Sequence, residues 1–475
     1  MDNLNLKYFD LVVCNLYPFD KEPCIENIDI GGVSLIRASS KNYKNVVVLS
    51  NPNQYHDFIT KFNVNEELFG IDQETRKIYA IEGFNMTSKY DNMISNNFSQ
   101  SSPEELVKLK YGMNPHQYDT KVTLVKPVNT NPFELINGVL GMINLIDVIH
   151  GWLTVKEVDD LLDLPAAISM KHTSLAGLAV GSNISKNTLN FFNLTDENEN
   201  ENITDVSIAF MKSRSGDPLS SFGDFICISR EVDEFTAGLI KKEICDGIAA
   251  PSFTPEALEI LKTKKNGKFI ILKMSTDYYK TILQSGWNES KEIYGIKLTQ
   301  RNNSYRNDFN ELNNEKLRID YVLANTALKY AQSNNISMAC DGQIIGMGCG
   351  QQNRVGCVKL AGDKSINWLA RQSVDALNFW YNNKNNNKKR QEKVNLLYEL
   401  IETGDIKPDT KEEDYNIVMS SDGFFPFPDN ITLANKYGVK HIIHPGGSIA
   451  DEIIHSKCLE YGIGLYITNN RMFYH

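Results

Sequence analysis

The chain has 475 residues, of which 41% are hydrophobic and 23% are charged, and its formal net charge at pH 7 is −10. This length predicts roughly two to four globular domains, and the acidic balance argues against a nucleic-acid-binding protein while allowing a local basic pocket for a small anion. The eight cysteines are scattered and form no CxxC pair, so we expect reduced thiols in a cytoplasmic protein without a metal site. With no apolar run of membrane-spanning length and no basic leader in the sequence, neither membrane insertion nor secretion is predicted.

The first 100 residues contain two apolar runs, at 9–16 and 45–49, and a helix-like stretch at 36–43 between them. A continuous apolar run is typical of a strand buried on both faces, which needs a neighbour on each side. We therefore expect residues 1–100 to be part of an α/β layer whose earlier strands are absent. The alternative is that this segment docks on the larger domain and is covered by it.

Residues 95–105 are rich in Ser, Asn and Gln and predict a linker. Beyond it, strand-like and helix-like segments alternate to the end, which predicts an α/β protein with mostly parallel strands. Two stretches, about 105–275 and 315–475, have a similar rhythm without a convincing sequence repeat, which suggests a duplicated architecture. The Asn-rich segments 196–202 and 382–390 predict solvated surface loops without chemistry.

Local signals indicate several elements within these two stretches. Thr254 precedes Pro255, which predicts a capped helix start, and residues 266–267 predict a turn before a strand at 268–274. Helices are predicted at 321–332, 354–377, 431–437 and 448–461, and strands at 336–340, 417–420, 441–444 and 464–468.

Residues 170–177, Met-Lys-His-Thr-Ser-Leu-Ala-Gly, lie between two short apolar runs. They predict a strand, a tight turn and a helix with Ser174 near its N-cap. The amide groups of that helix start and the charge of Lys171 would both disfavour protonation of His172, which gives a proton acceptor beside a cation. The alternative is structural, with Lys171 a solvated loop residue and His172 a turn histidine that has a backbone partner.

Two stretches near the end of the chain suit ligand contacts. Residues 422–430 contain three aromatic residues and two prolines directly after a predicted strand, which favours a wall for a flat heterocycle. The alternative is a core plug before a helix capped at Asp429. Residues 346–354 contain GxGxG but lack the third glycine and the acidic residue of a dinucleotide site, so we expect this turn to deliver Arg354 to an anion.

Three further stretches are weaker signals. Gly223, within residues 220–225, allows a ligand to approach the backbone, or it simply starts a strand. Residues 110–117 bring together a cation, an aromatic ring and two amides, and a plain turn is the favoured interpretation. Residues 470–475 are aromatic and basic, whereas most termini are polar and frayed, so packing of this segment into a site would be unusual.

Together these segments resemble the bifunctional purine-biosynthesis family of AICAR transformylase/IMP cyclohydrolase, over nearly the whole chain. The matching segments are residues 15–19, 28–32, 111–117, 171–172, 221–225, 246–247, 350–354, 360–364 and 420–427. The resemblance implies a truncated methylglyoxal-synthase-like domain at 1–100, followed at 101–475 by a formyltransferase domain of two cytidine-deaminase-like α/β halves. It also implies a homodimer with active sites at the subunit interface.

The implied activity is formyl transfer from the cosubstrate 10-formyltetrahydrofolate to AICAR in de novo IMP synthesis, giving formyl-AICAR and tetrahydrofolate. Because the chain lacks the HxE and PCxxC signature of zinc deaminases, no metal is expected. By resemblance, His172 is the catalytic base, Lys171 its electrostatic partner and Asn334 an assisting group. The resemblance also assigns Arg354, Phe424 and Asp429 to the folate side and Lys110, Tyr111, Asn144, Gly223, Arg471 and His475 to the nucleotide side, with Asp246 near the site.

The chain departs from the family pattern in three ways. Lys110 stands where the family usually has an arginine, so a bidentate contact with the nucleotide is lost. Leu175 stands where the family usually has a proline, so the backbone conformation of the loop after His172 is less restricted. The family's Ser-Gly-Gly-Thr phosphate loop and Lys-Thr-Leu-His-Pro segment have no counterpart, although Tyr17, Asp29 and Lys41 match remaining cyclohydrolase positions. We therefore expect impaired ring closure of formyl-AICAR to IMP. The competing hypothesis is a catalytically weak nucleotide- or folate-binding remnant.

Overall fold

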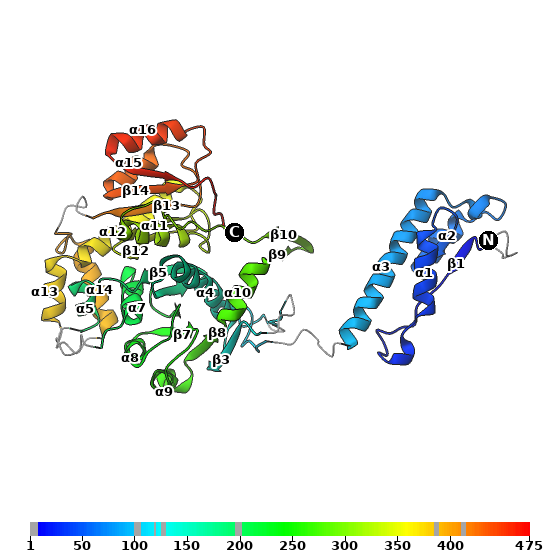
Figure 1. Ribbon diagram of the computed structural model, residues 1–475, viewed down its shortest axis with the longest axis horizontal. Helices are drawn as coiled ribbons and strands as arrows, with labels where there is room; N and C mark the ends of the chain where they lie inside the picture. The colour runs from blue at the N-terminus through cyan, green and yellow to red at the C-terminus, as the bar shows by residue number, and fades with distance from the viewer. Residues whose placement is uncertain are drawn as a thin grey trace. The chain divides into compact units, whose positions relative to one another are not determined.

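The computed structural model describes residues 8–98, 106–117, 120–124, 130–194, 202–383, 389–409 and 415–475. Most of the predicted linker and of the two predicted Asn-rich loops lies outside the described residues. The chain divides into two compact units (Figure 1). Unit 1 comprises Met1–Leu106 with Thr123–Val125, and unit 2 comprises Val107–Val122 with Lys126–His475.

Unit 1 is a small α/β unit built on one pair of parallel strands. Its elements are β1 (Leu11–Val13), α1 (Gly31–Lys41), β2 (Val47–Leu49), α2 (Asn53–Lys61) and α3 (Gln73–Phe98). The core consists of β2 with Phe58 of α2 and Tyr79 of α3.

Two predictions for unit 1 are wrong. The strand expected at 9–16, buried on both faces, is only the three residues of β1, and Val13 is 51% exposed. In the described part of the chain β1 pairs with β2 alone, so one of its edges is not covered by a strand. Residues 95–98, expected to belong to the linker, are instead the end of α3.

Unit 2 is built on an eleven-stranded sheet in the order β15-β14-β13-β11-β12-β5-β4-β6-β7-β8-β3. The strands are β3 (Phe133–Asn137), β4 (Ala166–Lys171), β5 (Ser174–Val180), β6 (Asp224–Ile228), β7 (Cys245–Ala250), β8 (Ile270–Met274), β11 (Ile336–Cys340), β12 (Gln343–Gly348), β13 (Ile417–Ser421), β14 (Val439–His444) and β15 (Gly464–Ile467).

The α/β class is confirmed, but the expectation of mostly parallel strands is wrong. Parallel pairing is confined to β6, β7 and β8 on one side and β13, β14 and β15 on the other. The centre of the sheet is antiparallel, because β4–β5 and β11–β12 are hairpins with two-residue turns. Parallel strands would need a crossover connection of a dozen or more residues.

Within the described residues, the two halves of unit 2 share a common order of elements, α-β-β-α-β-α-β-α-β (Figure 1). The first half adds β3 before this order and a second helix after the hairpin, and the second half adds two further helices after its hairpin. They meet where β5 and β12 run antiparallel, with Ala179 paired to Gln343. The helices are α4 (Met142–Leu162), α5 (Lys186–Phe191), α7 (Asp205–Gly216), α8 (Glu234–Lys242), α9 (Pro255–Lys262) and α10 (Thr276–Ser285), then α11 (Glu315–Thr326), α12 (Arg354–Arg371), α13 (Val374–Asn382), α14 (Arg390–Glu402), α15 (Asp429–Lys436) and α16 (Asp451–Tyr461).

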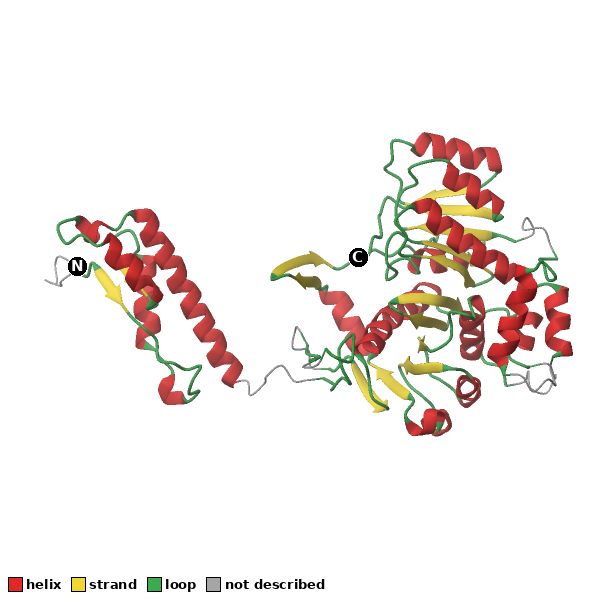
Figure 2. Ribbon diagram, turned by 180° about the vertical axis from the view of Figure 1, so that it is seen from behind, coloured by secondary structure: helices red, strands yellow, loops and turns green. Residues whose placement is uncertain are grey.

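Helices cover both faces of this sheet (Figure 2). On one face Trp152 of α4 and Val322 of α11 share a core with Ile168 of β4. On the other face α7 packs in one core and α12 in another. The central strands therefore bury both faces, which explains why they appear in the sequence as continuous apolar runs.

Two helix predictions differ most from the structure, and those at 431–437 and 448–461 differ from α15 and α16 by one to three residues at an end. The helix expected at 321–332 is α11, which starts at Glu315 because the Asn314 side chain caps it by accepting a hydrogen bond from the Leu317 amide. The helix expected at 354–377 ends at Arg371, and Ser373 caps the separate helix α13. The start of α9, with Thr254 as N-cap and Pro255 as first residue, is confirmed. No helix in the described ranges is long and apolar enough to cross a membrane.

Candidate active site

The strand register brings most of the predicted site residues to one edge of the sheet, which we call the site edge. There β4, β12 and β13 end and β6, β7 and β11 begin, as shown by the pairs Met170–Phe225, Asp224–Cys245, Ile336–Gly348 and Ile336–Ser421. The predicted residues that lie on or next to the connections at this edge are Lys171, His172, Gly223, Asp246, Asn334, Arg354 and Phe424.

The Lys171–His172 motif lies at the tip of the β4–β5 hairpin, so the predicted helix capped by Ser174 is wrong. Lys171 pairs with Ser174, and the turn residues His172 and Thr173 have positive φ values of 54° and 59°, as a tight hairpin turn requires. Because no helix begins here, no helix dipole acts on His172. The side chain of His172 is exposed.

Asp147 of α4 holds this turn in place. Its Oδ1 accepts a hydrogen bond from the Thr173 amide at 2.7 Å, and the residue is only 4% exposed. Burial raises the pKa of Asp147 to about 6, although the amides of Thr173 and His172 oppose the shift. Asp147 was not predicted as a site residue. Its signal in the sequence is a single carboxylate near the largely apolar start of α4.

We expect Asp147→Asn to alter the pH dependence of stability. A carboxyl group with a higher pKa in the folded than in the unfolded state binds more protons when folded, so its contribution to stability falls as pH rises from about 4, the unfolded value, to about 6. Urea unfolding across this range should show that fall in the wild type and a smaller one in the variant. Equal slopes of stability against pH would contradict the prediction.

A second expectation concerns activity. Since asparagine retains an acceptor for the Thr173 amide, Asp147→Ala should lower the activity more than Asp147→Asn does.

Lys171 is anchored beside the turn. Its Nζ donates a hydrogen bond to the Phe222 carbonyl at 2.5 Å. The next residue, Gly223, has φ +67°, and a Cβ placed there would meet no atom within 4 Å. Asp246 lies nearby at the start of β7 and accepts a hydrogen bond from Lys265 at 2.7 Å. The hairpin tip therefore has a cation, an imidazole and an open stretch of backbone close together.

Three further predicted residues lie on the chain leading to α4. The Lys110 amide donates to the Leu140 carbonyl at 3.0 Å, and its Nζ lies 5.4 Å from the centre of the Tyr111 ring. Asn144, in the first turn of α4, is half-buried. These residues approach the site edge from the side of the first half.

Arg354, the first residue of α12, forms the centre of a second group. Its Nη2 donates to Asn334 Oδ1 at 3.0 Å, and its Nη1 forms an ion pair with Asp422. Arg354 and Asp422 are 7% and 0% exposed, and Asp422 also accepts from Ser333 Oγ at 2.5 Å. The glycine turn thus places Arg354 against an anion, and that anion is the Asp422 carboxylate of the same chain. This role of Asp422 was not predicted.

A cavity of about 480 Å³ opens beside Arg354. Phe424 and Phe427, 40% and 64% exposed, contribute to its wall, whereas Phe425 is fully buried in the core. Phe424 and Phe427 therefore fit the predicted ligand wall, whereas Phe425 fits the alternative of a core plug. Asp429 begins α15, is exposed, and its Oδ1 accepts from the Asn430 amide at 2.8 Å rather than lining the cavity.

The last residues of the chain pack between the two halves. Tyr474 exchanges hydrogen bonds with Ser333, at 2.9 and 3.1 Å, and its hydroxyl lies 3.0 Å from His150 Nε2 of α4. Phe473 lines the cavity. Arg471 lies 4.5 Å from the Phe473 ring centre, and both Arg471 and His475 are exposed.

The hairpin tip and the cavity are separate within one chain. In the described residues, no hydrogen bond or ion pair joins Lys171 or His172 to the Arg354 group. Strand β5 of the hairpin is the direct neighbour of β12, which leads to Arg354. Strands β12 and β11 separate β5 from β13, which leads to Phe424, and this corresponds to about 14 Å at the usual strand spacing.

The family described as AICARFT/IMPCHase bienzyme matches residues 39–364 of this chain. The chain belongs to the AICARFT/IMPCHase family. Its relatives include "Bifunctional purine biosynthesis protein PurH" of Prochlorococcus marinus subsp. pastoris, which is 33% identical over 506 residues that cover 99% of this chain and 82% of that protein. The PurH protein of another Prochlorococcus marinus strain is 32% identical over 505 residues with the same coverage. The crystal structure of ForH aligns with 22% of this chain and 56% of its own, at 26% identity and a TM-score of 0.19.

The cyclohydrolase positions suggested by the AICARFT/IMPCHase resemblance all lie in unit 1. Tyr17 is 56% exposed. Asp29 accepts a hydrogen bond from the Gly32 amide at 2.6 Å, and Lys41 is the last residue of α1. None of the described residues forms a cluster of three or more His, Cys, Asp or Glu side chains able to hold a metal ion.

Proposed function

We propose that this member of the AICARFT/IMPCHase family transfers the formyl group of 10-formyltetrahydrofolate to the 5-amino group of AICAR, giving formyl-AICAR and tetrahydrofolate. The observation that carries the proposal is the hairpin turn at the site edge. This turn exposes His172 next to the anchored Lys171, and Asp147 fixes its backbone.

The reaction needs the two groups at the hairpin tip. The AICAR amine is a poor nucleophile because its lone pair is delocalised towards the carboxamide, so a base must take its proton as it attacks the formyl carbon. In this proposal the imidazole of His172 takes the proton. The Lys171 ammonium, assisted by the amide of Asn334, stabilises the oxyanion of the tetrahedral intermediate.

We assign the two substrates to different parts of the site edge. The cavity beside Arg354, with Phe424 in its wall, suits the flat rings of a folate, and Asp429 lies at the start of the helix that follows. The nucleotide would contact Lys110, Tyr111, Asn144, Gly223, Arg471 and His475, with Asp246 close by.

We propose that the active site is completed in a homodimer. A near-attack geometry needs the reacting atoms about 3–3.5 Å apart, whereas within one chain the aromatic wall of the cavity follows β13, three places along the sheet from β5 of the hairpin. A second copy could bring its cavity to this hairpin. In the same proposal, residues 1–100 form a methylglyoxal-synthase-like domain, the halves of 101–475 are cytidine-deaminase-like, and the protein works in the cytoplasm without a metal.

An assay with both substrates tests the function. The full chain is mixed with AICAR and 10-formyltetrahydrofolate, and tetrahydrofolate formation is followed by absorbance. We expect turnover that requires both substrates. A folded, dimeric protein without turnover would instead support the binding-remnant hypothesis.

We expect weak cyclohydrolase activity. In unit 1 the matching Tyr17 is largely exposed and the Asp29 carboxylate already accepts the Gly32 amide, so little of a preorganised site is present among these residues. IMP formation from supplied formyl-AICAR should therefore be close to the uncatalysed rate. Rapid turnover would contradict this prediction.

A further inference from the structure

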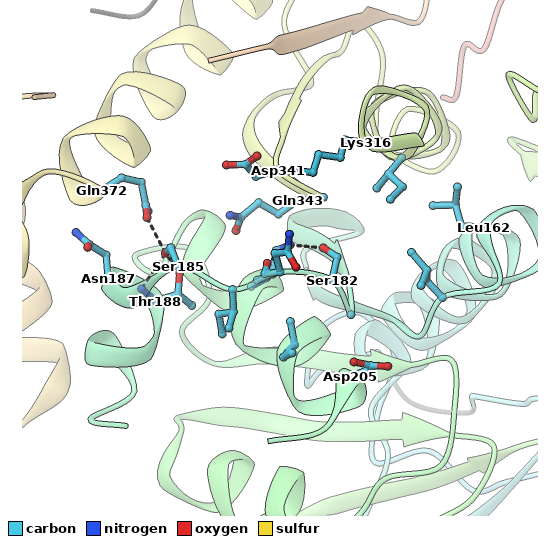
Figure 3. Close-up of a pocket in the computed structure, with 18 of the residues that line it drawn as sticks. Leu162, Ser182, Ser185, Asn187, Thr188, Asp205, Lys316, Asp341, Gln343 and Gln372 are labelled. Carbon is cyan, nitrogen blue, oxygen red and sulfur yellow. Dashed lines mark hydrogen bonds between the residues drawn. The ribbon is translucent and has the colours of Figure 1, made fainter. Parts of the chain in front are cut away.

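A second cavity, of about 960 Å³, lies at the opposite edge of the sheet, where β5 ends and β12 begins (Figure 3). Figure 3 shows Asp341, Gln343 and Gln372 of the second half facing Ser182 and Ser185 of the first half. None of the residues assigned above to formyl transfer lines this cavity. We call it the rear cavity.

The rear cavity lies beside the hairpin turn of the second half, just as the site edge carries the corresponding hairpin turn of the first half. The β11–β12 turn, Asp341–Gly342, has positive φ at both residues, as the His172–Thr173 turn has. The Gly342 amide donates to Asp320 of α11 at 2.7 Å, the same distance at which the Thr173 amide donates to Asp147 of α4. The duplication has therefore built the same turn, with the same carboxylate support, a second time.

The two places carry different ionisable groups. Asp341 takes the position of His172 at the start of the turn. Asp205, the first residue of α7, takes the position of Arg354, the first residue of α12. The rear cavity therefore does not repeat the electrostatics of an anion site.

Two deeply buried polar groups line the rear cavity without a partner. Gln343 and Trp368 are 3% and 2% exposed. Gln343 Oε1 and Trp368 Nε1 have no hydrogen bond within the described part of the chain. Buried polar groups are normally satisfied, because an unmade hydrogen bond is unfavourable. A molecule that fills the cavity should donate to the amide oxygen and accept from the indole N–H.

The charges of the remaining lining are unfavourable for an anionic occupant. Lys212 is already engaged, since its Nζ donates to Ser182 Oγ at 2.7 Å and to the Asn183 carbonyl at 3.0 Å. The exposed charges of the lining are the carboxylates of Asp205, Glu315 and Asp341 and the ammonium of Lys316. This excess of carboxylates disfavours a phosphate group.

Size and surface chemistry narrow the occupant further. The volume falls within the range of sites for small organic ligands, and aliphatic side chains such as Leu162, Ile208 and Ile319 alternate with amides and hydroxyls in the lining. We propose that the rear cavity binds an uncharged nucleoside, whose heterocycle carries both donors and acceptors. This inference goes beyond formyl transfer and does not depend on it.

Calorimetric titration of the full chain tests the inference. The probes are adenosine, inosine, cytidine and uridine, each with its 5′-monophosphate, in the presence of saturating AICAR so that the nucleotide site is filled. We expect at least one nucleoside to bind and its monophosphate to bind at least tenfold more weakly. A cavity that holds ordered water only would bind none of the four nucleosides, and that result, or equal affinity for the monophosphate, would overturn the inference.

Two variants locate the binding. Trp368→Phe removes the N–H group and keeps a ring, and Gln343→Leu removes the amide with little change in volume. Each should weaken nucleoside binding at least tenfold and leave formyl transfer unchanged. Tyr294→Ala, at a residue that is 99% exposed and outside the rear cavity, is the matched control and should bind like the wild type. Unchanged binding in Trp368→Phe would overturn the assignment even if Gln343→Leu failed to fold.

Discussion

His172→Ala should lower kcat/KM for formyl transfer by about 100- to 10,000-fold, the range expected for loss of a general base. The side chain is exposed at the hairpin tip, so the free energy of unfolding should change little. Steady-state kinetics with AICAR and 10-formyltetrahydrofolate, together with urea unfolding, measure both effects.

Two further variants make this result specific. His172→Asn removes the base but tolerates a positive φ, so a comparable loss of activity would show that chemistry, rather than turn conformation, is affected. His455→Ala removes another exposed histidine, on α16, and should behave like the wild type. If His172→Asn retained most of the activity, His172 would not be the base.

Asp422→Asn should be among the most destabilising single changes in the protein. It leaves the buried Arg354 guanidinium without its anion, and breaking a buried ion pair from one side typically costs about 3–5 kcal/mol. Asp422 also accepts hydrogen bonds from Ser333 Oγ and the Asn335 amide, so the loss extends to the segment that contains Asn334. Urea unfolding at pH 7 measures the change.

A surface ion pair provides the matched control for this variant. Glu460 pairs with Lys457 at 2.8 Å on exposed α16, where water screens the attraction. Glu460→Gln should therefore have a far smaller effect than Asp422→Asn. Similar losses from the two variants would mean that the Arg354–Asp422 pair is not a major contributor to stability.

Strands were predicted most accurately where turn residues flank a short apolar run on both sides. Residues 336–340 are β11 as predicted, and residues 464–468 differ from β15 by one residue. A helix with Ser174 near its N-cap was predicted after the Lys171–His172 turn, but residues 174–180 form the buried strand β5. A fully buried strand shows no alternation of apolar and polar residues, so the pattern does not separate it from a helix. The pairing of β5 between β4 and β12 decides its conformation, and that pairing is a long-range property that local patterns do not carry.

The same limit applies to the candidate site. The motifs predicted residues that occur in recognisable segments, such as Lys171, His172 and Arg354. They did not reveal Asp147 or Asp422, because a carboxylate that supports a distant turn or guanidinium has no local signature. Asp147 lies 26 positions before the amide that it accepts, and Asp422 lies 68 positions after its arginine.

The continuous sheet of unit 2 limits how the enzyme can open and close. Because β5 and β12 join the halves through backbone pairing, a hinge between the halves would have to break the middle of the sheet. Domain closure of the kind seen in clamshell enzymes is therefore disfavoured. We expect substrate entry and product release to depend instead on small segments beside the cavity, such as residues 471–475 and the Phe-Phe-Pro loop.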